Sequence, residues 1–138
     1  MSERAYAALP GHALKRVRLG GLEAIYHAPS GITHLLAEPV PELLDALISS
    51  NGLQGDQVLS ATFSVTADLD AMFPASLARR RPGWDGVALL DCQQMRVQGD
   101  LPRCIRVLVQ AQMPAEQTLH HPYLRETQRL RPDRSSHN

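Results

Sequence analysis

The sequence is poor in the residues that mark several classes of protein. Its only two cysteines, Cys92 and Cys104, form no CxxC pair, so neither a disulfide framework nor a zinc ribbon is indicated. Aromatic residues make up 4% of the chain and the formal net charge is zero, which argues against a nucleic-acid partner. The longest apolar run, residues 5–9, has five residues, far fewer than the ~20 of a membrane helix. We therefore expect no membrane partner.

The N-terminus also lacks a secretory signal, because it carries an acid and has no long apolar stretch. A cytoplasmic location is expected. The 138 residues, 43% of them apolar, predict one domain over residues 1–138. Within that domain, residues 1–12 are expected to form a flexible arm and residues 134–138 a flexible tail.

Recognisable catalytic and cofactor motifs are absent as well. The chain has no GxSxG, no P-loop and no Rossmann glycine pattern. His120 and His121 could ligate a metal, but no third ligand stands at a set spacing from them. Neither a metal nor a cofactor is expected.

Short elements alternate along the chain and predict an α+β or α/β class. Residues 42–50 and 74–81 have the apolar spacing and proline starts of helices. Gly20 and Gly21 interrupt the first apolar alternation, which predicts two short strands rather than one. The expected strands are 14–18, 22–27, 58–66, 87–92, 104–112 and 123–130.

Arg106 is the most unusual residue of the clearest strand. The apolar face of residues 104–112 holds Ile105, Val107, Val109 and Ala111. Arg106 shares the other face with Cys104 and Leu108, so its guanidinium leaves an apolar surface. Two interpretations stay open: an edge strand whose arginine reaches water, or a buried cation that awaits an anion.

Two further groups could serve a site. Asp91 and Gln94 follow a strand that starts apolar, and strand ends often present functional side chains. Arg79–Arg81, followed by Trp84, could grip an anion or could simply complement a helix C-terminus. The residues alone therefore indicate an anion-binding domain with no visible nucleophile.

Several segments occur together in a recognisable order: 63–75, 81–84, 91–97, 104–107, 121–124 and 130–133. With them, residues 51–133 resemble the AroH class of monofunctional chorismate mutases. The resemblance implies an α+β fold, with a mixed β-sheet inside and helices outside, assembled as a trimeric pseudo-barrel. It also implies a homotrimer with its active sites between subunits. The implied reaction is the pericyclic rearrangement of chorismate to prephenate, which needs no nucleophile, metal or cofactor.

The resemblance assigns roles to particular residues. Arg106 matches a cation beside the substrate's ether oxygen, and Gln94 stands where a glutamate usually receives the ring hydroxyl. Tyr123 matches a tyrosine whose hydroxyl contacts a substrate carboxylate. Arg79 matches an arginine that the neighbouring subunit contributes at the rim of the site. The same resemblance implies these substrate-binding residues: Phe73, Ala75, Ser76, Leu89, Leu90, Asp91, Leu130 and Arg131. Arg18 is added to them as a candidate for a carboxylate-binding arginine that the family carries near its N-terminus.

The N-terminal third departs from this family. The family opens with a strand ending in Arg-Gly-Ala-Thr, whose arginine grips a carboxylate, and a gapless count puts Glu23 in that place. Arg16 or Arg18 could replace it if the strand is shifted. Residues 24–47 resemble small PqqD-type peptide-binding chaperones instead. The alternatives to a mutase, with full or impaired activity, are a non-catalytic relative and a peptide- or carboxylate-binding module.

Overall fold

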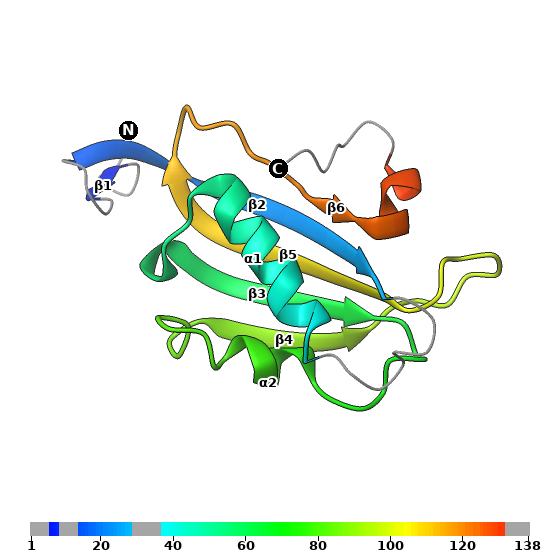
Figure 1. Cartoon of the computed structure of the whole chain (residues 1–138). Coiled ribbons are helices and arrows are strands. Elements are labelled where there is room, and N and C mark those ends of the chain that lie inside the picture. The colour runs from blue at the N-terminus through cyan, green and yellow to red at the C-terminus, as the bar shows by residue number, and fades with distance from the viewer. Residues whose placement is uncertain (1–5, 9–13, 29–36, 132–138) are drawn as a thin grey trace.

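The computed structural model describes residues 6–8, 14–28 and 37–131, which form one mixed β-sheet with two α-helices on one face (Figure 1). This α+β architecture confirms the expected fold class. No helix within these ranges is long and apolar enough to cross a membrane. The strands are β1 (Tyr6–Ala8), β2 (Leu14–His27), β3 (Val58–Val65), β4 (Ala88–Gln93), β5 (Cys104–Pro114) and β6 (Tyr123–Leu124). The helices are α1 (Pro39–Asn51), α2 (Pro74–Ala78) and the 3-10 turns η2 (Gly55–Gln57) and η3 (Arg125–Leu130).

Strand β5 lies in the middle of the sheet, whose order is β1-β2-β5-β3-β4. It pairs antiparallel with β2 on one side and with β3 on the other, while β3 and β4 run parallel. Strand β6 pairs with the C-terminal end of β2. The edge-strand interpretation of Arg106 is therefore wrong, because both neighbours of β5 are present at that residue.

Strand β2 is continuous, so the predicted break at Gly20 and Gly21 is wrong. Residues 17–27 pair with β5 without interruption, and the ladder of hydrogen bonds outweighs the low strand propensity of glycine. A Cβ at Gly20 would lie 2.9 Å from the Sδ atom of Met113, so a larger residue there would have to displace that buried side chain. Close side-chain approach explains this glycine better than a turn does.

The chain ends differ from prediction too. Tyr6–Ala8 forms β1 within the expected flexible arm, and the rest of that arm and the tail 134–138 lie outside the described residues. The predicted strand 123–130 is only two residues long before η3 begins. Arg125 adopts a positive φ of 63°, which ends the extended conformation. The two predicted helices are confirmed, the second being shorter than expected.

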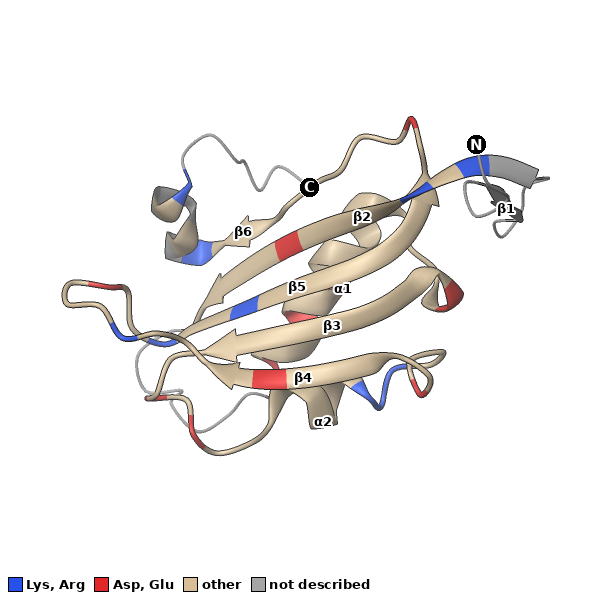
Figure 2. Ribbon diagram, turned by 180° about the vertical axis from the view of Figure 1, so that it is seen from behind, with Lys and Arg blue, Asp and Glu red and all other residues tan. Residues whose placement is uncertain are grey.

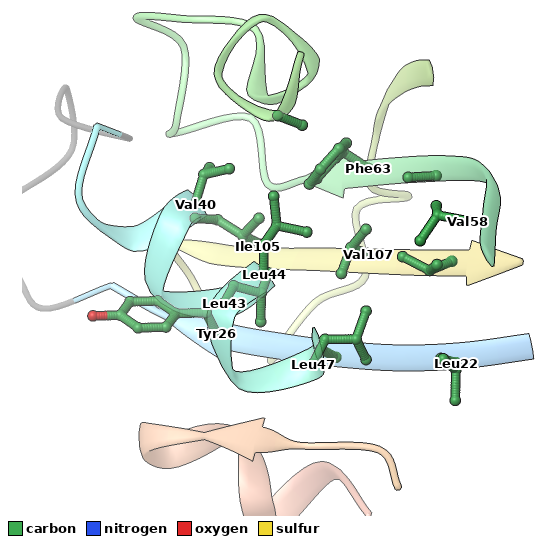
Figure 3. Close-up of a cluster of buried hydrophobic side chains, with 14 of the residues drawn as sticks. Leu22, Tyr26, Val40, Leu43, Leu44, Leu47, Val58, Phe63, Ile105 and Val107 are labelled. Carbon is green, nitrogen blue, oxygen red and sulfur yellow. The ribbon is translucent and has the colours of Figure 1, made fainter. Parts of the chain in front are cut away.

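The hydrophobic core lies between the sheet and α1 (Figure 3). Val40, Leu43, Leu44 and Leu47 of α1 are fully buried against β2, β3 and β5. Each such side chain contributes about 1.5–3 kcal/mol relative to an exposed one. Because β5 sends Ile105 and alternate residues toward α1, the intervening residues, Arg106 among them, face away from the helices.

Asn51 ties the end of α1 to the segment that leads into β6. Its buried side-chain amide donates to the carbonyl oxygens of Leu47 and His120, both at 2.9 Å. Its Oδ1 accepts the N–H of His120 at 2.9 Å, and the Gln117 amide donates to the Asn51 carbonyl at 2.8 Å. These contacts hold the approach to Tyr123 in place.

We expect Asn51→Ala to lower the free energy of unfolding by about 1–3 kcal/mol, because it removes a buried side-chain amide together with its hydrogen bonds to Leu47 and His120. Urea denaturation followed by circular dichroism measures this change. Ser49→Ala on the same helix is the control, since its exposed hydroxyl makes only a 3.4 Å contact. Equal stability of the two variants would contradict the role given to Asn51.

Candidate functional site

The candidate site lies on the face of the sheet that carries no helix (Figure 2). Strand register puts one row of residues directly across this face: Cys92, Ser64, Arg106, Ile25 and Tyr123. Paired residues of neighbouring strands point to the same side. Arg106 and Tyr123 are therefore brought together across β2, with about 10 Å between their backbones.

Arg106 presents an unused hydrogen-bond donor. Its side chain is half-buried, and its Nε is buried with no acceptor among the described residues. An unpaired polar group inside a protein is costly, so such a donor is a strong sign of a ligand position. The backbone of Arg106 is paired with β2 on one side and β3 on the other, so the point from which its side chain extends is rigid.

Gln94 presents an unused acceptor on the same face. Its backbone N–H donates to the Val65 carbonyl at 2.8 Å, which closes the last β3–β4 pair, and alternation beyond Gln93 places Gln94 on the side of Cys92. Its Nε2 donates to Asp100 at 3.3 Å, while its buried Oε1 has no donor among the described residues. Strand spacing and rise separate the backbones of Gln94 and Arg106 by about 12 Å.

Asp91 points to the opposite side of the sheet. It pairs in register with the buried Phe63, and its Oδ1 accepts the N–H of Ala75 in α2 at 3.0 Å. Leu89 shares this helix-covered side and packs against the core, whereas Leu90 is 57% exposed on the helix-free face. Of these three, only Leu90 shares a face with Arg106.

The residues of α2 lie apart from Arg106 within one chain. Helix α2 packs beside α1 and β4 on the helix-covered side (Figure 1). Ala75 is buried, Ser76 is half-buried and Arg79 is exposed just after the helix. Phe73, at the start of α2, is 72% exposed, an unusual position for a large ring. These four residues form a separate wall.

The C-terminal residues lie beside the end of β2. Tyr123 is buried, and the Thr127 hydroxyl holds η3 against β2 through the carbonyl of Ile25 at 3.2 Å. Leu130, half-buried, and Arg131, exposed, follow at the end of this turn.

Arg18 lies far from this cluster. It opposes Met113, seven residues along β2 from Ile25, which corresponds to about 23 Å. Its guanidinium donates to the carbonyl of Gln117 at 2.5 Å. Within one chain, Arg18 is not brought together with Arg106.

Two cavities lie at the end of the sheet where β3 and β4 finish. One, of about 470 Å³, is lined by Thr66–Asp68 and by the 94–102 loop that includes Gln94. The other, of about 320 Å³, includes Phe73, Asp91 and Cys92. Both are large enough for a small organic anion.

Sequence reasoning missed two residues of the helix-free face. Ser64 is the neighbour of Arg106 in the row and Cys92 follows Ser64 on β4; the polar alternation Ser60, Thr62, Ser64 could have indicated Ser64. Glu23, predicted to stand in place of an arginine, opposes Leu108 and is therefore diagonal to Arg106. A carboxylate thus shares this face with the cation.

Cys104 is not a reactive group of this face. Burial raises the pKa of its thiol to about 11, although the Arg106 charge acts in the other direction. The thiol is therefore neutral near pH 7 and a poor nucleophile. Within the described ranges, no three His, Cys, Asp or Glu side chains gather to hold a metal ion.

Residues 30–134 match a model of the family described as chorismate mutase type I. The chorismate mutase AroH of Bacillus subtilis is 37% identical over 102 residues, covering 72% of this chain and 80% of the relative. The chorismate mutase AroH of Thermus thermophilus is 44% identical over 97 residues, covering 69% and 79%. The solved structure of a chorismate mutase from Clostridium thermocellum superposes with a TM-score of 0.70 at 29% identity, covering 79% of this chain and 97% of that one.

Proposed function

Because the chain belongs to the chorismate mutase type I family, its activity is that of a chorismate mutase, and we propose that chorismate rearranges to prephenate on the helix-free face at Arg106. The observation that carries this assignment is the pair of unused buried atoms, Arg106 Nε and Gln94 Oε1. Chorismate has two carboxylates, an ether oxygen and a ring hydroxyl. One donor cation and one acceptor suit the last two groups.

Arg106 stabilises the transition state electrostatically. The breaking ether bond gathers negative charge on its oxygen, and a fixed cation beside that oxygen lowers the barrier without forming a bond. The central position of β5 supports this role, because the backbone of Arg106 cannot move without breaking pairs on both sides. The site also holds the extended substrate in the compact conformer that reacts.

Gln94 and Tyr123 orient the substrate. The free Oε1 of Gln94 accepts the ring hydroxyl, since a neutral amide oxygen can still accept this hydrogen bond, although more weakly than a charged carboxylate does. Tyr123, in the same row as Arg106, directs its hydroxyl to a substrate carboxylate. Leu130 and Arg131 close the site from the end of η3.

The wall formed by Phe73, Ala75, Ser76 and Arg79 comes from a neighbouring subunit. In one chain, α2 and Arg106 occupy opposite sides of the sheet, so a closed site needs a second copy. The helix-free face also exposes large apolar side chains, including Leu90 at 57% and Leu108 at 47%. Burial of these side chains favours the homotrimer. The cytoplasmic location expected from the sequence stays a prediction.

A peptide-binding module receives no support from the N-terminal segment. Such a module would expose an apolar groove beside residues 22–27. Leu22 and Ala24–Tyr26 are instead buried within the sheet.

We expect Arg106→Ala to lower kcat by at least about 100-fold, because it removes the cation at the developing charge. Turnover is followed by loss of the ultraviolet absorbance band of chorismate, and chromatography confirms prephenate as the product. Arg81→Ala is the control, since Arg81 pairs with Asp45 of α1 on the other side of the sheet. Wild-type turnover by a folded Arg106→Ala protein would remove Arg106 from this role.

A shared site predicts complementation between subunits. Arg79→Ala and Arg106→Ala chains, each inactive alone, should regain activity when unfolded together and reassembled, since some interfaces then combine an intact Arg79 with an intact Arg106. Activity is compared with the mean of the two separate variants. No gain in mixed trimers verified by native mass spectrometry would contradict the shared site.

Glu23 predicts weakened binding of the dianionic substrate. Its carboxylate lies diagonal to Arg106, within reach of a ligand on that cation. We expect Glu23→Gln to lower KM for chorismate by about 2- to 5-fold at low salt, with a smaller effect at high salt. Glu38→Gln, at the start of α1, is the control. An unchanged or higher KM for Glu23→Gln would contradict repulsion by Glu23.

A further inference from the structure

We propose that Asp91 is a positioning residue that holds α2 against β4 and thereby sets the place of Arg79 in the neighbouring subunit's site. The inference rests on the shared site proposed above and adds a residue to it. The resemblance to the family instead places Asp91 at a strand end beneath the substrate.

The contact that carries this inference joins two elements. Asp91 Oδ1, in β4, accepts the N–H of Ala75, in the first turn of α2, at 3.0 Å. Among the described residues, this is the one hydrogen bond between a side chain of β4 and α2. Phe73, at the helix start, supplies no side-chain cap, and Ala75 is only 5% exposed. Without Asp91 the Ala75 N–H would be buried and unpaired.

The position of Arg79 follows from that of Ala75. The backbone N–H of Arg79 donates to the Ala75 carbonyl at 2.9 Å, one helical turn later. The Ser76 hydroxyl and N–H both bond to the Phe73 carbonyl, at 2.7 and 3.0 Å, so these contacts stay within the segment. Asp91 therefore links a segment that is rigid internally to the sheet beside it.

The direction of Asp91 also explains how an acidic residue is tolerated next to an anion site. On the helix-free face its carboxylate would repel both carboxylates of chorismate. On the helix-covered side it lies instead against the first turn of α2, where it accepts the N–H of Ala75. Asp91 and Gln94 are three residues apart in sequence, yet on this assignment they serve different active sites.

The first test separates the hydrogen bond from the charge. Asp91→Ala removes the acceptor, and we expect kcat/KM to fall about 5- to 30-fold, the equivalent of a lost helix cap. Asp91→Asn keeps an oxygen that accepts the Ala75 N–H and should retain activity close to wild type. Asp85→Ala, at an exposed acid of the loop before β4, is the matched control. Equal loss in the Ala and Asn variants, or no loss in either, would overturn the proposal.

The second test asks which half of the site Asp91 serves. Mixed trimers of Asp91→Ala with Arg106→Ala should exceed the mean activity of the two pure variants, because the defects lie in different halves. Mixed trimers of Asp91→Ala with Arg79→Ala should only equal the mean activity of those two variants, because both defects lie in the same half. The reverse pattern would place Asp91 with its own subunit's Arg106 and overturn the proposal.

Two further measurements keep the outcomes apart. Failure of Arg79→Ala to complement Arg106→Ala would count against the shared site itself, whatever Asp91 does. Should Asp91→Ala fail to assemble, Asp91→Ser, whose shorter side chain weakens the same contact, enters the same mixtures. Asp91→Ala could also lower the thermal stability and give the same activity in mixtures with Arg106→Ala as in mixtures with Arg79→Ala. That result would mean that Asp91 has only a structural role, and it would overturn the proposal.

Discussion

The pairing of β5 with both of its neighbours is the constraint on which the rest of the structure depends. This register sends Ile105, Val107 and Val109 into the core against α1 and turns Arg106 to the helix-free face. A slip of one residue would exchange the two faces, bury the cation under the helix and expose the core. Burial of the apolar row thus stabilises the fold, and the same register determines the face to which Arg106 points.

The parts of the fold that follow from local patterns were predictable. The alternation around Arg106 gave both faces of β5, and proline starts marked the two helices. The continuity of β2 through Gly20 was not predictable, because it results from pairing with a strand some ninety residues away. The end of β6 at Arg125 depends on the positive φ of that one residue, which no pattern in the sequence predicts.

The site divides in the same way. Arg106 and Gln94 could be named from the sequence through a family resemblance, and each has an unused buried atom. The side of the sheet to which Asp91 points could not be predicted. Strand β4 has no fully buried residue on either face, so its sequence carries no clear apolar alternation. Nor could sequence alone show that Glu23 shares a face with Arg106, because that relation exists only once β2 and β5 are in register.

With the site shared between subunits as proposed, the placement of Arg106 and α2 on opposite sides of one sheet would make catalysis a property of the assembly rather than of the chain. Mass action then governs output: below the concentration at which copies associate, folded chains would accumulate without turnover. Specific activity would therefore rise with abundance instead of staying constant. A cell that dilutes this protein by growth would lose activity faster than it loses polypeptide.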